Sequence, residues 1–546
     1  MKRIDVLPDD VLLGIFDFYM IMNPSYSVKT EIEAWQSLVH VSRRWRRLVL
    51  GSPRRLNLRL FCTPGTPARD TLDVWPALPL IVSGITDESL SGMDNVIAAL
   101  GQSNCVCQVF LDLAGWQFEK VLASMQVSFP ELVRMQLWSH DETPPVIPDS
   151  FLDGSAPRLE YFTLHGVPFP GLPNLLLSAN HLVYLALSDI PHSGYISPEA
   201  MVPPICALSS LEILSLGFES PRSYPDLESR SLPPPKRSVL PALNFIVFKG
   251  VIEYFEDLVT RIDTPQLEGM DITFFNQIDF DCPRLGHFTN CTPTLRARDE
   301  ALVQFDDSTA RVKLRYWTSQ SDYDDLLISI SCREPDWQLS FIEQICTSSL
   351  HPISTVEDLY IEHQYSQLVW KNDAIENTLW WQLLLSFTAV KNLYLSKEFA
   401  PGIAAALQEL VGGRITTEVL PALQNIFVEG LESLGPFQEN IAQFVTARRL
   451  SGHPFAISFR NSLSGTRKKR KRMKRKAHLS CMRSTLASIG RGTDIVVCAH
   501  RRYCGRVPRG RFGSTGAWHR RRVSSFLSFG PKRLLKGTMN AEGPNA

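Results

Sequence analysis

The sequence predicts a mixed α/β protein in which a short helical module precedes an irregular array of strand and helix units, followed by a basic tail. Two apolar stripes at helical spacing lie within residues 4–60, and an apolar triplet with the period of a β-strand recurs within residues 105–460. Residues 61–104 are expected to connect these two parts. The composition changes abruptly after residue 460, so residues 461–546 form the tail.

The first helix of the module is expected to begin at Leu7-Pro8-Asp9-Asp10. Proline at the first helical position loses no hydrogen bond, and acidic residues in the first turn interact favourably with the helix dipole. An apolar stripe follows, formed by Val11, Leu12, Ile15, Phe16 and Tyr19. The polar segment Asn23-Pro24-Ser25 is expected to end this helix.

The next helix is expected to be amphipathic, with a basic back. Its apolar positions are Leu38, Val41, Trp45 and Leu48, and its remaining faces carry Arg43, Arg44, Arg46 and Arg47. Chains as short as this module bury only a modest fraction of their surface. The apolar groups therefore need a neighbour, which is either the rest of this chain or another protein.

The order Leu7-Pro8-x-Asp10-Val11-Leu12-Leu13-x-Ile15-Phe16, followed by Val41-Ser42-Arg43-Arg44-Trp45-Arg46-Arg47-Leu48, resembles the F-box. F-box modules dock substrate receptors on the Skp-type adaptor of cullin ubiquitin ligases, so the resemblance implies that partner for this chain. The residues that it implies for adaptor binding are Leu7, Pro8, Val11, Leu12, Ile15, Phe16, Leu38, Val41, Trp45 and Leu48.

Nine apolar triplets share the spacing apolar-x-x-apolar-x-apolar. They are Leu132-x-x-Met135-x-Leu137, Leu159-x-x-Phe162-x-Leu164, Leu182-x-x-Leu185-x-Leu187, Leu211-x-x-Leu214-x-Leu216, Leu243-x-x-Ile246-x-Phe248, Leu267-x-x-Met270-x-Ile272, Val356-x-x-Leu359-x-Ile361, Val390-x-x-Leu393-x-Leu395 and Leu423-x-x-Ile426-x-Val428. The last two apolar positions of each triplet lie two residues apart, which predicts a short strand with one buried face. Helices are expected between some of these strands, at residues 337–348, 379–389 and 402–411.

Recurring strand, turn and helix resemble a degenerate leucine-rich-repeat solenoid, in which neighbouring units bury a continuous core. The segment Phe444-Val445-x-Ala447-Arg448-x-Leu450-Ser451-Gly452-His453-Pro454 also resembles the end of F-box proteins that are abundant in mushroom-forming fungi. In a solenoid the strand face usually binds the partner. The residues that this implies for binding a target protein are Trp138, His165, Lys249, Asp271, Tyr360, Glu362 and Tyr394.

The tail concentrates positive charge. The chain has 56 basic and 56 acidic residues, but residues 461–546 hold 22 basic residues against Asp494 and Glu542, which leaves a net charge of +20 there and −20 in the rest. Such a segment is expected to be disordered. The basic run predicted to act in nuclear import is Arg467, Lys468, Lys469, Arg470, Lys471, Arg472, Lys474, Arg475 and Lys476. Incorrect exon joining is the open alternative for this segment.

The sequence contains no phosphate-binding loop, dinucleotide-binding fingerprint, nucleophile elbow or zinc-protease motif, so we expect no catalysis, cofactor or metal. The acids Asp322, Asp324 and Asp325 lack metal-ligand spacing, and Cys498-x-His500-x-x-x-Cys504 offers three ligands where a structural zinc site needs four. Eleven cysteines without a Cys-x-x-Cys pair indicate reduced thiols.

No apolar run approaches the about 20 residues of a membrane-spanning helix, and acidic residues interrupt the N-terminus where an export signal is apolar. We therefore expect an intracellular protein, located in the cytoplasm and, if the tail acts as an import signal, in the nucleus. The hypothesis for its function is a substrate receptor of a Skp-cullin-F-box ubiquitin ligase that binds an unknown target protein. The alternative is a nuclear, nucleic-acid-associated protein that uses the basic tail.

Overall fold

The computed structural model describes residues 7–22, 34–75, 77–85, 92–221, 236–276, 280–296, 298–316, 325–363, 374–409, 418–429 and 435–460. They belong to a compact unit that spans residues 1–500, and a second unit, residues 501–546, lies outside the described residues, as does the whole predicted tail. The described part is a mixed α/β structure with a large, mostly parallel sheet, which confirms the predicted class. None of its helices is long and apolar enough to cross a membrane.

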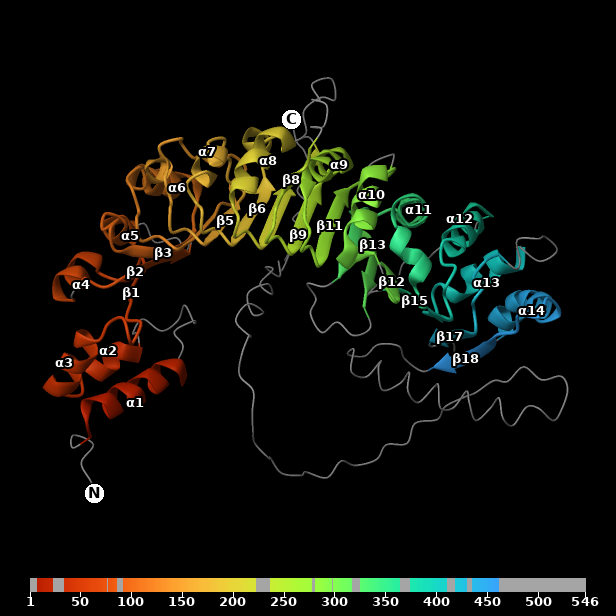
Figure 1. The fold of residues 1–546 in the computed structure, drawn as a ribbon, viewed down its shortest axis with the longest axis horizontal. Helices are drawn as coiled ribbons and strands as arrows, with labels where there is room; N and C mark the ends of the chain where they lie inside the picture. Colours follow the sequence, from red (N-terminus) through yellow and green to blue (C-terminus); the bar gives the residue numbers. More distant parts are fainter. Residues whose placement is uncertain are drawn as a thin grey trace, which may run out of the picture. The chain divides into compact units, whose positions relative to one another are not determined.

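The helices follow the chain in the order labelled in Figure 1. They are α1 (Asp9–Met22), α2 (Ala34–Val39), α3 (Arg43–Gly51), α4 (Ala68–Val74), α5 (Met93–Leu100), α6 (Gly115–Ser124), α7 (Leu172–Leu176), α8 (Pro198–Ala207), α9 (Ile252–Arg261), α10 (Pro283–Cys291), α11 (Pro335–Gln344), α12 (Ala374–Leu385), α13 (Ala400–Glu409) and α14 (Gly435–Leu450). The three helices expected between the strands correspond to α11, which continues into a π-helical turn at Ile345–Ser349, and to α12 and α13.

The strands follow the same alternation. They are β1 (Leu60–Cys62), β2 (Leu80–Ile85), β3 (Val106–Asp112), β4 (Arg134–Trp138), β5 (Tyr161–His165), β6 (Tyr184–Ile190), β7 (Ile213–Phe218), β8 (Ser238–Val239), β9 (Phe245–Gly250), β10 (Ile262–Asp263), β11 (Gly269–Phe275), β12 (Glu300–Phe305), β13 (Thr309–Arg315), β14 (Leu326–Ser331), β15 (Asp358–His363), β16 (Asn392–Leu395), β17 (Asn425–Glu429) and β18 (Ala456–Arg460). All except β8 and β10, which pair with each other, belong to one sheet of 16 strands.

The nine predicted triplets form strands of this sheet, and their side chains are at most 4% exposed. Equivalent positions pair directly across neighbouring strands: Met135 with Phe162, Phe162 with Leu185, and so on to Met270 in β11. The apolar positions therefore form continuous rows on one face of the sheet. The described helices that connect successive strands lie along this face, and among described elements none covers the other face (Figure 1).

Three strands between β11 and β15 depart from the regular order. The hairpin β12–β13 and the strand β14 enter the sheet in reverse, giving the order β11-β14-β13-β12-β15, with β13 antiparallel to both neighbours. The triplet pattern missed these strands because the position of its first apolar residue is polar in each of them: Glu300 in β12, Thr309 in β13 and Asp325 before β14. The predicted array thus missed this part of the sheet.

Residues 61–104, predicted to connect the helical module to the strand units, also form part of the sheet. They contain β2, α4 and α5 and most of β1, and β1 and β2 extend the sheet beyond β3 by parallel pairing. The indole Nε1 of Trp35 in α2 donates a hydrogen bond of 2.9 Å to the carbonyl oxygen of Arg59, and its ring packs edge-on against Trp75 at 5.0 Å. The helical module is therefore packed directly onto the first strand units.

Candidate functional site

The N-terminal module, α1 to α3, divides its apolar residues between an internal core and an exposed surface. Leu12, Phe16, Leu38 and Trp45, all predicted to contact an adaptor, are buried between 0% and 8% exposed. The rings of Phe16 and Trp45 lie 4.7 Å apart, at the centre of the module. These four side chains hold the helices together, so they cannot also offer their surface to a partner unless the module opens.

Polar contacts fix the position of α3 against α1. Ser42 caps α3 by accepting a hydrogen bond of 3.2 Å from the backbone N–H of Trp45. Arg44 forms an ion pair with Asp9 in α1, and its Nη2 donates a hydrogen bond of 2.7 Å to the carbonyl oxygen of Leu7. The first turns of α1 and α3 therefore lie side by side.

A row of apolar side chains on α1 remains in contact with solvent. Val11, Ile15 and Phe18 are 46%, 41% and 64% exposed, and their spacing of four and three residues places them on one face of the helix. We call these three residues the apolar stripe. Val41, just before α3, is 59% exposed. Large contiguous apolar patches on a protein surface commonly mark interaction sites.

The structure thus divides the ten predicted adaptor residues. Four of them, Pro8, Val11, Ile15 and Val41, are exposed. Leu7 and Leu48 are half-buried, and the remaining four form the internal core. Phe18 was missed, although its position three residues after Ile15 and seven after Val11 was a sufficient signal for the same face.

A second candidate site lies where strands β3 to β9 end on the face without described helices. Six side chains from five strands and the loop after β4 meet there: Asp112, Trp138, His140, His165, Asp189 and Lys249. We call this group the rim cluster. The sheet register creates it, because Asp112 pairs with Trp138, and Trp138 pairs with His165, on consecutive parallel strands.

A β-bulge completes the rim cluster. The pairing of β6 with β7 shifts between Leu187 and Ile190, and Asp189 adopts a φ of 48°, a left-handed conformation that aspartate tolerates better than most residues. The Oδ1 atom of Asp189 accepts a bond of 2.7 Å from Lys249 Nζ. Lys249 pairs with Gly217 on the intervening strand β7.

The rim cluster combines aromatic surface with charge of both signs. The ring centroid of His165 lies 5.5 Å from those of Trp138 and His140, and His140 lies 3.5 Å from Asp112. Burial lowers the pKa of His165, and His140 and Lys249 add to this effect against the opposing influence of Asp189. The His165 ring is therefore neutral at neutral pH.

Ser188, His165 and Asp189 have the residue types of a hydrolytic triad, but their geometry does not favour one. Nδ1 of His165 lies 3.0 Å from Ser188 Oγ, while Nε2 is 3.5 Å from Asp189, longer than a hydrogen bond. The hydroxyl of Ser188 also donates to the carbonyl oxygen of Leu164, and Lys249 neutralises Asp189. The arrangement suits recognition of a polar partner better than nucleophilic attack.

The other predicted target residues lie away from the rim cluster. Asp271 lies further along the same face, where burial raises its pKa against the opposing influence of Lys313 and Arg311. Tyr360 and Tyr394 are each 2% exposed and stack at 4.2 Å, and Tyr394 also stacks on Phe427 at 4.7 Å. Glu362 is half-buried at the end of β15. The two tyrosines therefore contribute to packing and offer almost no accessible surface.

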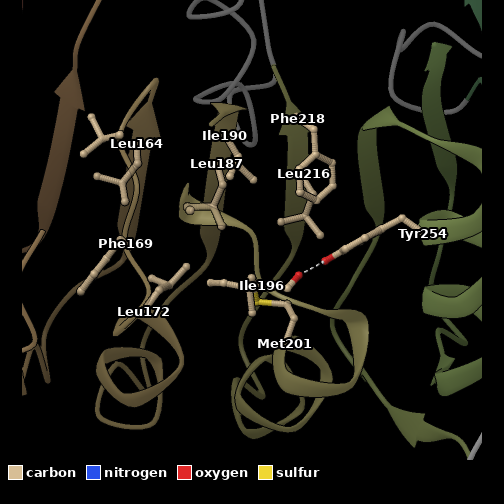
Figure 2. Close-up of a pocket in the computed structure, with 12 residues that line it drawn as sticks. Leu164, Phe169, Leu172, Leu187, Ile190, Ile196, Met201, Leu216, Phe218 and Tyr254 are labelled. Carbon is tan, nitrogen blue, oxygen red and sulfur yellow. Dashed lines mark hydrogen bonds between the residues drawn. The ribbon is translucent and has the colours of Figure 1, made fainter. Parts of the chain in front are cut away.

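A small cavity lies between the sheet and the helices, and its lining excludes a polar ligand (Figure 2). Its walls come from β5, β6, β7 and the segments around α7 and α8, and include Leu164, Leu187, Leu216 and Met201. Its one phenol, Tyr254, donates a hydrogen bond of 3.0 Å to the carbonyl oxygen of Ile196. We interpret this cavity as a packing defect in the core.

Within the described ranges, no group of three or more His, Cys, Asp or Glu side chains could hold a metal ion. Asp325 pairs with Lys313 at 2.7 Å, while Asp322, Asp324, Cys498, His500 and Cys504 lie outside those ranges. The nine basic residues predicted for nuclear import lie outside them too.

Comparison with models of protein families gives no match for this chain. A search of curated proteins gives no match either. The resemblance to F-box proteins therefore stays a prediction.

Proposed function

We propose that this protein is the substrate receptor of a cullin-type ubiquitin ligase. In this proposal α1 to α3 form an F-box-like module that docks on a Skp-type adaptor, and the strand units form a leucine-rich-repeat-like solenoid that binds a target protein. The observation that carries the proposal is the apolar stripe, which remains exposed although the module already has a packed core. Such a surface fits docking better than internal packing.

The energetics of the stripe are consistent with a stable partner. Complete burial of one large apolar side chain contributes about 1.5–3 kcal/mol, and roughly half of each stripe residue is already covered. Covering Val11, Ile15 and Phe18 therefore contributes about 1 kcal/mol for each side chain. Val41 and the half-buried Leu7 and Leu48 extend the contact. The partner is therefore expected to bury a patch of apolar side chains that is surrounded by polar ones.

The rim cluster is the proposed contact for the target protein. It combines an indole, two imidazoles, two carboxylates and an ammonium group on an open sheet face. Tryptophan is among the residues that most often supply binding energy in protein interfaces, which favours Trp138 as the central contact. The receptor would then act by positioning, because holding the target near the ubiquitin carrier converts their encounter into an intramolecular event.

Capture of a purified Skp-type adaptor tests the docking half of the proposal. The double variant Ile15→Glu/Phe18→Glu is expected to weaken capture by about 100-fold, since it removes apolar burial and introduces charges into the interface. Both positions are exposed and glutamate is a good helix former, so the module should stay folded. Val127→Glu, a change at a residue that is 51% exposed and lies after α6, is the matched control.

Equal capture by the double variant and the wild type would refute docking through α1. For the target half, proteins that purify with the full chain are compared with those that purify with Trp138→Ala/Lys249→Ala. Target proteins should be lost from the variant while the adaptor remains. An unchanged set of target proteins would remove the rim cluster from the proposal.

A further inference from the structure

The helical module and the segment after it carry an unusual concentration of arginine. Residues 34–69 contain eight arginines and neither lysine, aspartate nor glutamate: Arg43, Arg44, Arg46, Arg47, Arg54, Arg55, Arg59 and Arg69. The chain as a whole has equal numbers of basic and acidic residues. Residues 34–69 therefore carry a strong local excess of positive charge, in addition to that of the tail.

Two of these arginines have structural roles. Arg44 bonds to Asp9 and to the carbonyl oxygen of Leu7, and Arg46 donates from Nε to the carbonyl oxygen of Val39 at 3.1 Å. Arg43, Arg47, Arg54 and Arg55 are exposed, and within the part of the chain that the structure describes no acidic side chain pairs with them. We call these four residues the arginine surface.

The arrangement is unfavourable for α3 by itself. Arg43 is the first residue of the helix, where the helix dipole disfavours positive charge, and Arg47 lies one turn further on the same side. Like charges four residues apart in a helix repel each other. The helix has no acidic residue in its first turn to compensate. An anionic partner would relieve both effects.

The arginine surface adjoins apolar surface. The bonds of Arg44 to Asp9 and Leu7 bring the first turn of α3 next to the first turn of α1, where the apolar stripe begins with Val11. Val41, which is 59% exposed, lies two residues before Arg43. A nucleic acid backbone would satisfy the arginines but leave these apolar groups in water, whereas a protein with apolar and acidic side chains would cover both.

We infer that the arginine surface recognises a carboxylate-rich segment of the protein that covers the apolar stripe. Guanidinium groups bind carboxylates through two parallel hydrogen bonds, which lysine cannot form. The inference rests on the proposed function, in which that protein is the Skp-type adaptor. It adds that charge attraction raises the rate of association with the adaptor, while apolar contact stabilises the complex once it has formed.

The test measures association of the full chain with purified adaptor between about 30 mM and about 500 mM salt, across which the Debye length shortens severalfold. Removing two charges in Arg43→Ala/Arg47→Ala should lower the association rate about fivefold or more at low salt and leave it unchanged at high salt. Arg43→Lys/Arg47→Lys should keep the steered rate but dissociate faster. Arg333→Ala removes an exposed arginine far along the chain and is the control.

The outcomes separate the two proposals. If wild type and Arg43→Ala/Arg47→Ala associate at the same rate with the same dependence on salt, the arginine inference is wrong while adaptor docking stands. If the wild type does not bind adaptor at any salt concentration, both fail. An RNA oligonucleotide is the competitor: if it displaces adaptor from the wild type but not from the alanine variant, the arginine surface binds nucleic acid and the inference is overturned.

Discussion

Glu256 in α9 is expected to stabilise the neighbouring helix α10 across 29 residues of sequence. The first residue of α10, Pro283, has no N–H, and the next two N–H groups, of Arg284 and Leu285, donate to the carboxylate of Glu256 at 3.1 Å and 2.7 Å. The side chain of Cys282, the residue before α10, does not cap the helix. Glu256 is thus the cap of this helix, provided by another helix.

Replacing Glu256 by alanine should cost about 1–2 kcal/mol, the range of a lost helix cap. Two charge-assisted hydrogen bonds would stabilise α10 by more than this range. Glu256 is only 9% exposed, however, and the cost of burying its carboxylate offsets part of their contribution. Glu256→Gln keeps one acceptor oxygen and should cost roughly half as much. Glu268→Ala changes an exposed acid in the turn before β11 and should have no effect.

Hydrogen exchange of the amides of α9 and α10 is the appropriate assay, since it reports the opening of one region separately from the rest of the protein. A loss of about 1.4 kcal/mol corresponds to about tenfold faster exchange. Unchanged exchange in Glu256→Ala would refute the capping argument.

The pH dependence of Glu256 gives a second test of this cap. Burial raises the pKa of Glu256, and the hydrogen bonds from Leu285 and Arg284 only partly oppose this. A raised pKa in the folded state means that the contribution is fully present below the unfolded pKa of about 4.3 and is lost as the pH rises through the folded value. The advantage of the wild type over Glu256→Gln should therefore be larger near pH 4 than near pH 7.

Three further predictions concern local stability. Phe16→Ala should destabilise the helical module by about 3–5 kcal/mol, whereas Phe18→Ala on the exposed face should change its stability by less than about 0.5 kcal/mol, as measured by hydrogen exchange of α1. Gly166→Ala should lower the thermal midpoint, because φ is 67° and a Cβ atom would lie 2.4 Å from the carbonyl oxygen of Ser139. Burial tends to raise the pKa of Asp306, but hydrogen bonds within its own turn outweigh burial and lower it. Its contribution to the β12–β13 hairpin should be present above pH 4 and disappear as the pH falls through the folded pKa, and Asp306→Ala should abolish this dependence in exchange experiments.

The sequence alone determined most of the strands that carry the core. A triplet such as Leu159-x-x-Phe162-x-Leu164 has a period of two and a turn before it, and these local features suffice to predict a short strand with one buried face. The strands β12, β13 and β14 lack the leading apolar residue of the triplet, since Glu300, Thr309 and Asp325 occupy that position, and the pattern therefore missed them. Their reversed order in the sheet depends on contacts between segments far apart in the sequence, which no local pattern encodes.

Only the tertiary structure decided which residues of a predicted site are accessible. The pattern on α1 identified Phe16 and Ile15 as equally apolar, but packing against Trp45 buries Phe16 and leaves Ile15 41% exposed. Likewise, Trp138 and Tyr394 are both outward positions of predicted strands, yet Tyr394 is buried by stacking between neighbouring rings. Periodicity assigns a residue to one side of an element, while its exposure depends on which other elements cover that side. The rim cluster has the same origin, because sheet register and one β-bulge bring together side chains that are far apart in the sequence.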